Sequence, residues 1–205
     1  MKNNIYNFGA GPSMIPTAVM MKIHQEFLDY QGFGASIIEL SHRLPFFKEI
    51  LDKSESIFRD LTGLPDNYRL IFMHGGAQMQ FSAVPLNLMA RKSHIGSYLI
   101  TGRWGILAEK EARRYGKTEV LADGKEFEYS RIPDYDSGLL DQNTSYVHLT
   151  SNNTLYGTCW HEFPETRDVP LVVDATSDIL SRKIDYSLFG VVYAGLQKNL
   201  GIPGT

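Results

Sequence analysis

Two residues of opposite charge in the last third of the chain could carry chemistry together. Asp174 closes the apolar run 170–173, and Lys198 follows the apolar run 191–194, 24 residues further along. A lysine that is partly removed from water can lose its proton and form a Schiff base with a carbonyl group. A carboxylate at a strand end can hold a protonated ring nitrogen or a metal. Taken singly, Lys198 fits a solvated lysine near a turn, and Asp174 fits the N-cap of a helix starting near residue 176.

A glycine-containing segment at residues 74–79 (HGGAQM) could bind an anion. It stands between a predicted strand at 69–73 and a predicted helix at 78–89. Glycines allow backbone N–H groups to approach a phosphate, and the start of a helix supplies unpaired donors and a partial positive charge. The alternative is a plain turn between strand and helix, because two adjacent glycines are a weak signal.

An aromatic residue and a hydroxyl follow two other predicted strands. Trp104 comes after the strand predicted at 97–101, and Thr154 comes after the strand predicted at 145–149. An indole can stack on a flat cofactor ring, although a tryptophan is more often a core residue. Phosphate loop, indole, hydroxyl, carboxylate and lysine are together what a pyridoxal-phosphate site needs. Periodicity alone leaves other cofactors open.

These residues need a parallel sheet to bring them together. Short β-branched runs alternate with longer amphipathic segments, which is typical of an α/β domain with helices on both faces of the sheet. The carboxyl ends of parallel strands meet at one edge, where ligands bind. The remaining predicted strands are 118–121, 171–173 and 191–194, and a further helix is predicted at 106–115.

The first third of the chain predicts two helices and irregular loops. Pro16 suits the first turn of a helix over residues 16–30, and apolar residues recur at helical spacing from Pro45 to Thr62, where Gly63 supplies a stop. Residues 7–13 and 32–36 contain the glycines of loops. We expect one large domain over residues 1–205, with an N-terminal arm over about residues 1–15.

The composition points to a small-molecule partner. The chain has 205 residues, 43% hydrophobic and 21% charged, with a formal charge of -3 and no basic run, so neither nucleic acid nor an anionic membrane is an expected partner. The single cysteine, Cys159, excludes an internal disulfide and fits the cytoplasm, and no Cys/His spacing predicts a metal site. No stretch approaches the roughly 18 apolar residues of a membrane span.

Several motifs together resemble the phosphoserine aminotransferase family. They are residues 7–12 (NFGAGP), 41–43 (SHR), 81–87 (FSAVPLN), 173–182 (VDATSDILSR) and 193–199 (YAGLQKN). The resemblance implies a fold-type I pyridoxal-phosphate transferase large domain, with a mostly parallel sheet flanked by helices. The SHR and QKN contexts argue against another aminotransferase of the same fold group.

The resemblance also implies roles for particular residues. Lys198 would carry pyridoxal 5'-phosphate as a Schiff base and move the proton during catalysis, and Asp174 would pair with the pyridinium nitrogen. Trp104 would stack on the ring, while four residues would contact the rest of the cofactor or its phosphate: Ala77, Gln78, Thr154 and Gln197. His42 and Arg43 would bind the distal anion of the substrate, although alone they read as caps of the helix that begins at Pro45.

The implied reaction is the transamination of 3-phosphohydroxypyruvate with glutamate, giving phosphoserine and 2-oxoglutarate in serine biosynthesis, by a homodimer. A second role in pyridoxine biosynthesis stays open. Some relatives carry an arginine where this chain has Gln78. Family members also continue well beyond residue 205, into a C-terminal small domain absent here, so we expect an incomplete site and exposed apolar surface. The alternative is an inert piece that at most binds the cofactor or dimerises.

Overall fold

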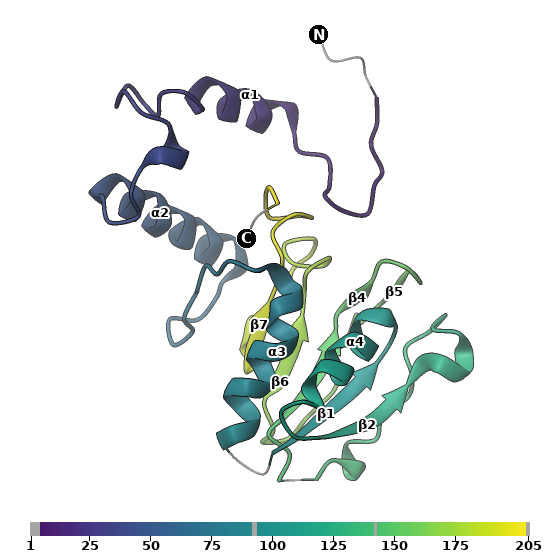
Figure 1. The fold of residues 1–205 in the computed structure, drawn as a ribbon. Coiled ribbons are helices and arrows are strands. Elements are labelled where there is room, and N and C mark those ends of the chain that lie inside the picture. Colours follow the sequence, from purple (N-terminus) through teal and green to yellow (C-terminus); the bar gives the residue numbers. More distant parts are fainter. Residues whose placement is uncertain (1–4, 92–93, 142, 204–205) are drawn as a thin grey trace. The chain divides into compact units, whose positions relative to one another are not determined.

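The computed structural model describes residues 5–91, 94–141 and 143–203, and the chain divides into two compact units. The first unit is Met1–Ile71 and the second is Phe72–Thr205 (Figure 1). Within the described ranges, no helix combines the length and the apolar character needed to cross a membrane.

The N-terminal unit consists of helices joined by loops. They are α1 (Thr17–Glu26), the short 3-10 helix η1 (Ile37–Glu39) and α2 (Pro45–Thr62). The bounds of α2 confirm the prediction: Pro45 occupies the first turn, and Gly63 ends the helix at a φ of 66° while its N–H donates to the Arg59 carbonyl. The prediction for α1 was wrong at its C-terminal end. The Asp29 carboxylate accepts the Gly34 N–H at 2.7 Å, and this local bond favours a loop over further helix.

The C-terminal unit contains a five-stranded sheet in which all neighbouring strands are parallel. The strand order is β2-β1-β3-β6-β7. Its members are β1 (Ile95–Ile100), β2 (Lys117–Asp123), β3 (Tyr146–Thr150), β6 (Leu171–Asp174) and β7 (Val191–Tyr193). Each overlaps a predicted strand, which confirms the mostly parallel α/β sheet.

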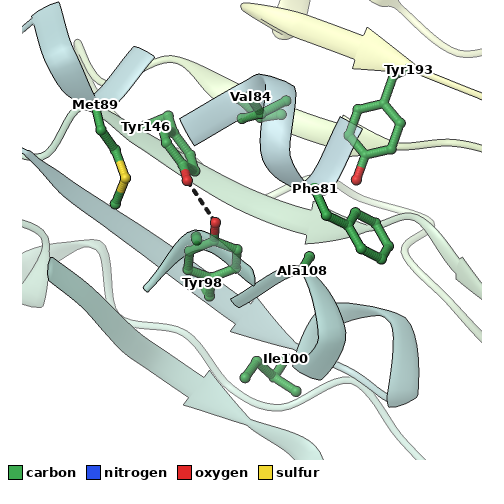
Figure 2. Packing of buried hydrophobic residues seen from close by; sticks show 10 residues of the cluster. Phe81, Val84, Met89, Tyr98, Ile100, Ala108, Tyr146 and Tyr193 are labelled. Carbon is green, nitrogen blue, oxygen red and sulfur yellow. Dashed lines mark hydrogen bonds between the residues drawn. The ribbon is translucent and has the colours of Figure 1, made fainter. Parts of the chain in front are cut away.

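Two α-helices cover one face of this sheet. These helices, α3 (Gly76–Leu88) and α4 (Arg103–Ala112), contribute Phe81, Val84 and Ala108 to a core shared with the sheet residues Tyr98 and Tyr146. Figure 2 shows this core, in which the hydroxyls of the two tyrosines lie 2.6 Å apart. The tyrosines occupy neighbouring strands, so this bond joins β1 to β3 inside the core.

The later connections of the sheet contain no α-helix in the described residues. They contain only the 3-10 helices η3 (Gly124–Phe127), η4 (Ser137–Leu139) and η5 (Tyr186–Leu188), and a hairpin of β4 (Asn152–Asn153) and β5 (Thr158–Cys159); η2 (Met89–Arg91) extends α3. The expectation of α-helices on both faces is therefore not met within this unit. The loops after β3 and β6 are instead held by side-chain hydrogen bonds, which are described below.

One predicted strand is absent. Residues 69–73 have no strand structure, and Ile71 is 71% exposed. A β-branched and aromatic run forms a strand only where another strand pairs with it, and the boundary between the two units falls inside this run. The segment before α3 is consequently a loop, so the glycine-containing segment at residues 74–79 joins a loop, not a strand, to a helix.

Candidate active site

Most of the predicted site residues of the C-terminal unit lie at or just after the carboxyl ends of its strands, whereas Ala77 and Gln78 lie in the first turn of α3. The chain runs from β1 outward to β2 and then crosses back to β3, so the strand order reverses between β1 and β3. In open parallel sheets this reversal is where ligands bind. Trp104 lies at the start of α4 after β1, Thr154 after β3, Asp174 at the end of β6, and Lys198 after β7.

The Asp174 carboxylate is buried and held by its own loop. Its Oδ1 accepts the backbone N–H of Thr176 at 3.0 Å and the Thr176 hydroxyl at 2.6 Å. Burial raises the pKa of Asp174 above its ordinary value, whereas the bonds from Thr176 and the charge of Lys198 oppose the rise. Residues 176–180 form turns and no helix, so the reading of Asp174 as a helix N-cap was wrong.

The Lys198 amine is half-buried and lies close enough to Asp174 for the two charges to interact. Burial lowers the pKa of Lys198, and the Asp174 carboxylate opposes that shift. A lowered pKa increases the fraction of neutral amine, which is the form that attacks a carbonyl carbon. Among the described residues, no group of three or more His, Cys, Asp or Glu side chains gathers as metal ligands.

The glycine segment places the start of α3 beside the lysine loop. Gly75 has a φ of 100°, and a Cβ there would lie 2.3 Å from the Met79 sulfur, so this position requires glycine. A Cβ on Gly195 would lie 3.5 Å from both the N and the Cβ of Ala77, and 3.3 Å from the Gln197 Oε1. The N-terminus of α3 therefore contacts the loop that carries Gln197 and Lys198.

The start of α3 keeps free donors for an anion. Its N-cap is Gly75, which has no side chain that could accept a hydrogen bond from the first turn. The first N–H groups of a helix have no partner within the helix, so they can bind an anion. Ala77 is half-buried and Gln78 is exposed in this first turn, where both can be reached by a ligand.

Trp104 lies at the start of α4, Thr154 lies on the hairpin after β3, and the segments that carry them are joined by hydrogen bonding. The Asn153 amide donates to the Thr101 hydroxyl at 2.7 Å, which joins the hairpin after β3 to the end of β1. A Cβ on Gly102 would lie 2.5 Å from the Asn153 Oδ1, so the two loops are in close contact. Thr154 begins the hairpin turn and is exposed, while Trp104 is half-buried against the core.

Sequence reasoning missed the polar residues that hold these loops. The Asn152 amide donates to the Ser177 hydroxyl at 2.9 Å, and that hydroxyl donates to the Asn152 carbonyl, also at 2.9 Å. The Thr176 hydroxyl accepts the Gly195 N–H at 3.2 Å. Hydrogen bonds thus connect the loops after β1, β3, β6 and β7. The only sequence signal was small polar residues directly after apolar strands.

His42 and Arg43 belong to the N-terminal unit, and their substrate role stays a prediction. Both are exposed in a turn directly before α2. The N-cap of α2 is Leu44, with no side-chain hydrogen bond to the helix, so neither residue caps it. The alternative reading of this pair as helix caps was therefore wrong.

A parallel sheet that brings a lysine, a buried carboxylate and a glycine-led helix start to one edge fits the class of pyridoxal-phosphate enzymes. The chain belongs to the class-V aminotransferase family, whose model matches residues 5–205. Within that family, it is similar to the phosphoserine aminotransferase of Bacillus cereus, with 44% identity over 200 residues, covering 98% of this chain and 55% of the relative.

Solved structures show the same likeness. The phosphoserine aminotransferase of Bacillus circulans subsp. alkalophilus superposes with a TM-score of 0.91 at 41% identity, over 97% of this chain and 55% of that one. The pyridoxal-phosphate-bound phosphoserine aminotransferase of Trichomonas vaginalis gives a TM-score of 0.86 at 29% identity, over 97% and 56%. The chain therefore spans about half the length of the relatives it matches.

Proposed function

We propose that the C-terminal unit holds pyridoxal 5'-phosphate, with Lys198 as the residue that bonds to it. The residues fit the group in three respects. Asp174 is a buried carboxylate within electrostatic reach of a half-buried lysine, α3 begins beside the lysine loop with the unpaired N–H groups of a helix start, and Trp104 offers an aromatic face at the start of α4. The structure of the relative from Trichomonas vaginalis contains the same cofactor.

Each residue of this edge has a separate task in the proposed mechanism. The bound cofactor would supply an aldehyde for the amino group and a ring that accepts electrons. Asp174 would hold a proton on the ring nitrogen, and the first turn of α3, with Ala77 and Gln78, would bind the phosphate. Lys198 would take up and return a proton at its Nζ, which its lowered pKa favours.

The remaining contacts would orient the ring. Trp104 would cover one ring face and exclude water from it, and Thr154 and Gln197 would donate hydrogen bonds to the cofactor. Thr154 is exposed on the hairpin, and Gln197 is half-buried beside Gly195. Both side chains can therefore be reached by a ligand at this edge.

For the whole protein we propose phosphoserine aminotransferase activity, in which 3-phosphohydroxypyruvate and glutamate are converted to phosphoserine and 2-oxoglutarate in serine biosynthesis. The support is the 44% identity to curated phosphoserine aminotransferases over nearly the whole of this chain. His42 and Arg43 would bind the distal phosphate or carboxylate of these substrates, since a guanidinium binds both anions well. The phosphohydroxythreonine step of pyridoxine biosynthesis is a second reaction to assay.

The proposal also covers the domain organisation, the oligomeric state and the cellular location of the protein. Residues 1–205 would belong to one cofactor-binding large domain with an arm over about residues 1–15, and the protein would work as a cytoplasmic homodimer. The family match from residue 5 to residue 205 supports a single domain. The lone cysteine, Cys159, supports a reducing compartment.

The observation that carries the cofactor proposal is the approach of Lys198 to buried Asp174, and replacing Lys198 tests it. The chain is mixed with pyridoxal phosphate, treated with borohydride, digested and analysed by mass spectrometry. We expect a visible absorbance band and a reduced cofactor fixed to the peptide that contains Lys198. Lys198→Ala should remove both, whereas Lys183→Ala, at an exposed lysine of the same unit, should change neither.

Labelling spread equally over exposed lysines would contradict the cofactor site. A second candidate function is that these 205 residues bind the cofactor or dimerise without turnover. Following 2-oxoglutarate-dependent loss of phosphoserine with the same sample separates the two. Site-specific labelling without turnover favours the second candidate.

A further inference from the structure

Thr176 makes three hydrogen bonds that connect Asp174 to the loop after β7. Its backbone N–H and its hydroxyl both donate to the Asp174 Oδ1, at 3.0 and 2.6 Å. The same hydroxyl oxygen accepts the backbone N–H of Gly195 at 3.2 Å. A hydroxyl has a single proton, and an ionised carboxylate can only accept, so the proton points to Asp174 and the Gly195 N–H completes the chain.

This arrangement gives the two carboxylate oxygens of Asp174 different hydrogen-bond partners. Oδ1 takes two donors, and in the part of the chain that the structure describes no hydrogen bond reaches Oδ2. One oxygen is therefore held while the other can meet a ring nitrogen. The bond from Gly195 polarises the hydroxyl and strengthens its bond to the carboxylate.

Among the residues that the structure describes, no other side chain bonds to the Asp174 carboxylate. Lys198 acts on it through charge, and Tyr193, its neighbour on β7, interacts with it electrostatically. Ser177, the next residue after Thr176, bonds instead to Asn152 on the hairpin. Thr176 alone among these residues bonds both to Asp174 and to the loop of Lys198.

We propose that Thr176 is a positioning residue that fixes the orientation of the Asp174 carboxylate and couples it to the loop that carries Lys198. The meaning of this for catalysis rests on the proposed function, but the coupling is a property of the chain without cofactor. It makes Thr176 act on the ring nitrogen through Asp174, without touching the cofactor. The side-chain hydroxyl is the essential part, because the backbone bond survives substitution.

The test measures the Asp174 carboxyl directly in the cofactor-free chain. Aspartate carboxyl carbons are labelled with 13C, the Asp174 signal is assigned by its loss in Asp174→Asn, and its pKa is read from an NMR titration. In Thr176→Val we expect that pKa to rise by about one pH unit, because a donor to the charged form is lost. Amide exchange at Gly195 should also become faster in Thr176→Val.

Two matched variants separate coupling from general damage. Thr176→Ser keeps the hydroxyl and should return the pKa of Asp174 and the exchange rate of Gly195 to wild-type values. Ser177→Ala removes the neighbouring hydroxyl and should leave the pKa of Asp174 unchanged. If Thr176→Val does not fold, Thr176→Ala removes the same hydroxyl with less bulk and gives the same readouts.

The outcomes distinguish this inference from the proposed function. An Asp174 pKa within about 0.3 unit of wild type in Thr176→Val or Thr176→Ala would overturn the role of Thr176. If the pKa shifts as expected, the affinity for pyridoxal phosphate should fall about tenfold in the same variant, because a carboxylate that is no longer held in place must be ordered when the ring nitrogen binds. A shifted pKa in a chain that never binds the cofactor supports the coupling and contradicts the cofactor proposal.

Discussion

Within residues 72–205, Leu99, Val147 and Leu149 are fully buried in the sheet, whereas Ser36 is the only buried residue among residues 5–71. Helix α2 forms all the same, although it leaves Leu61 65% exposed. Its ends are set by Pro45 and Gly63, and its surface carries the pair of Arg59 with Glu55. Local signals thus specify the helices of the first unit, and packing specifies the sheet of the second.

The largest expected difference between the units concerns apolar side chains. Leu149→Ala in β3 should lower the free energy of unfolding by about 2–5 kcal/mol, because Leu149 is 0% exposed and a cavity would remain. Leu61→Ala in α2 should change it by less than about 0.5 kcal/mol. Urea titrations followed by far-UV circular dichroism and by the fluorescence of Trp104 and Trp160, both in the second unit, measure these values.

Equal losses of unfolding free energy from the two substitutions would contradict this difference between the units. They would mean that the apolar stripe of α2 is covered in solution. A lower urea midpoint for Leu149→Ala alone, visible in tryptophan fluorescence, would show that the stability of the sheet unit depends on its own core.

Acid should destabilise the sheet unit through His148. This imidazole lies between the rings of Tyr98 and Tyr193, with its Nε2 2.9 Å from the Tyr193 hydroxyl, and burial lowers its pKa to about 3. The unfolded chain binds the proton at about pH 6.5. Stability is therefore fully present above pH 6.5 and falls by about 1.4 kcal/mol per pH unit below it, or about 2 kcal/mol at pH 5.

The measurement is the urea midpoint by tryptophan fluorescence between pH 7 and pH 5. His148→Phe should remove this part of the pH slope, although it leaves the Tyr193 hydroxyl without its partner. His161→Gln, at an exposed histidine of the same unit, should keep the slope. An unchanged slope in His148→Phe would show that other groups cause the acid loss.

Two glycines with similar backbone angles, one in each unit, allow the units to be compared through a smaller change in stability. Gly63 ends α2 at a φ of 66° and Gly157 ends the hairpin turn at 75°, and a Cβ on either would meet no atom within 4 Å. Alanine at either position should cost about 1 kcal/mol through left-handed strain. Gly63→Ala should speed amide exchange in α2 alone, while Gly157→Ala should lower the urea midpoint reported by tryptophan. A midpoint change from Gly63→Ala would argue against independent units.

The sequence predicted what periodicity and short-range signals encode. The five strands and the helices α2, α3 and α4 follow from β-branched runs, helical spacing and glycine stops. Parallel strands then place Asp174 and Lys198 at one edge, without knowledge of side-chain contacts. The strand at 69–73 failed because a run of suitable residues does not supply its own pairing partner.

The parts that could not be predicted depend on contacts between distant residues. Asn153 bonds to Thr101, 52 residues away, and Asn152 bonds to Ser177, 25 residues away. Small polar residues have no periodicity, so their partners cannot be read from spacing. The hydrogen bonds of Thr176 to Asp174 are local in sequence, but the bond from the Gly195 N–H to Thr176 forms only when β6 and β7 pair.

The hydrogen bonds of Asn153 also affect the entropy of ligand binding. A loop that becomes ordered only around a ligand loses conformational freedom at that moment, and this loss weakens the affinity. Here the hairpin is already joined to β1 through Thr101 and packed against Gly102, where a larger residue would strike Asn153. The edge of the sheet is thus ordered by folding itself, so most of a ligand's contact energy can appear as affinity.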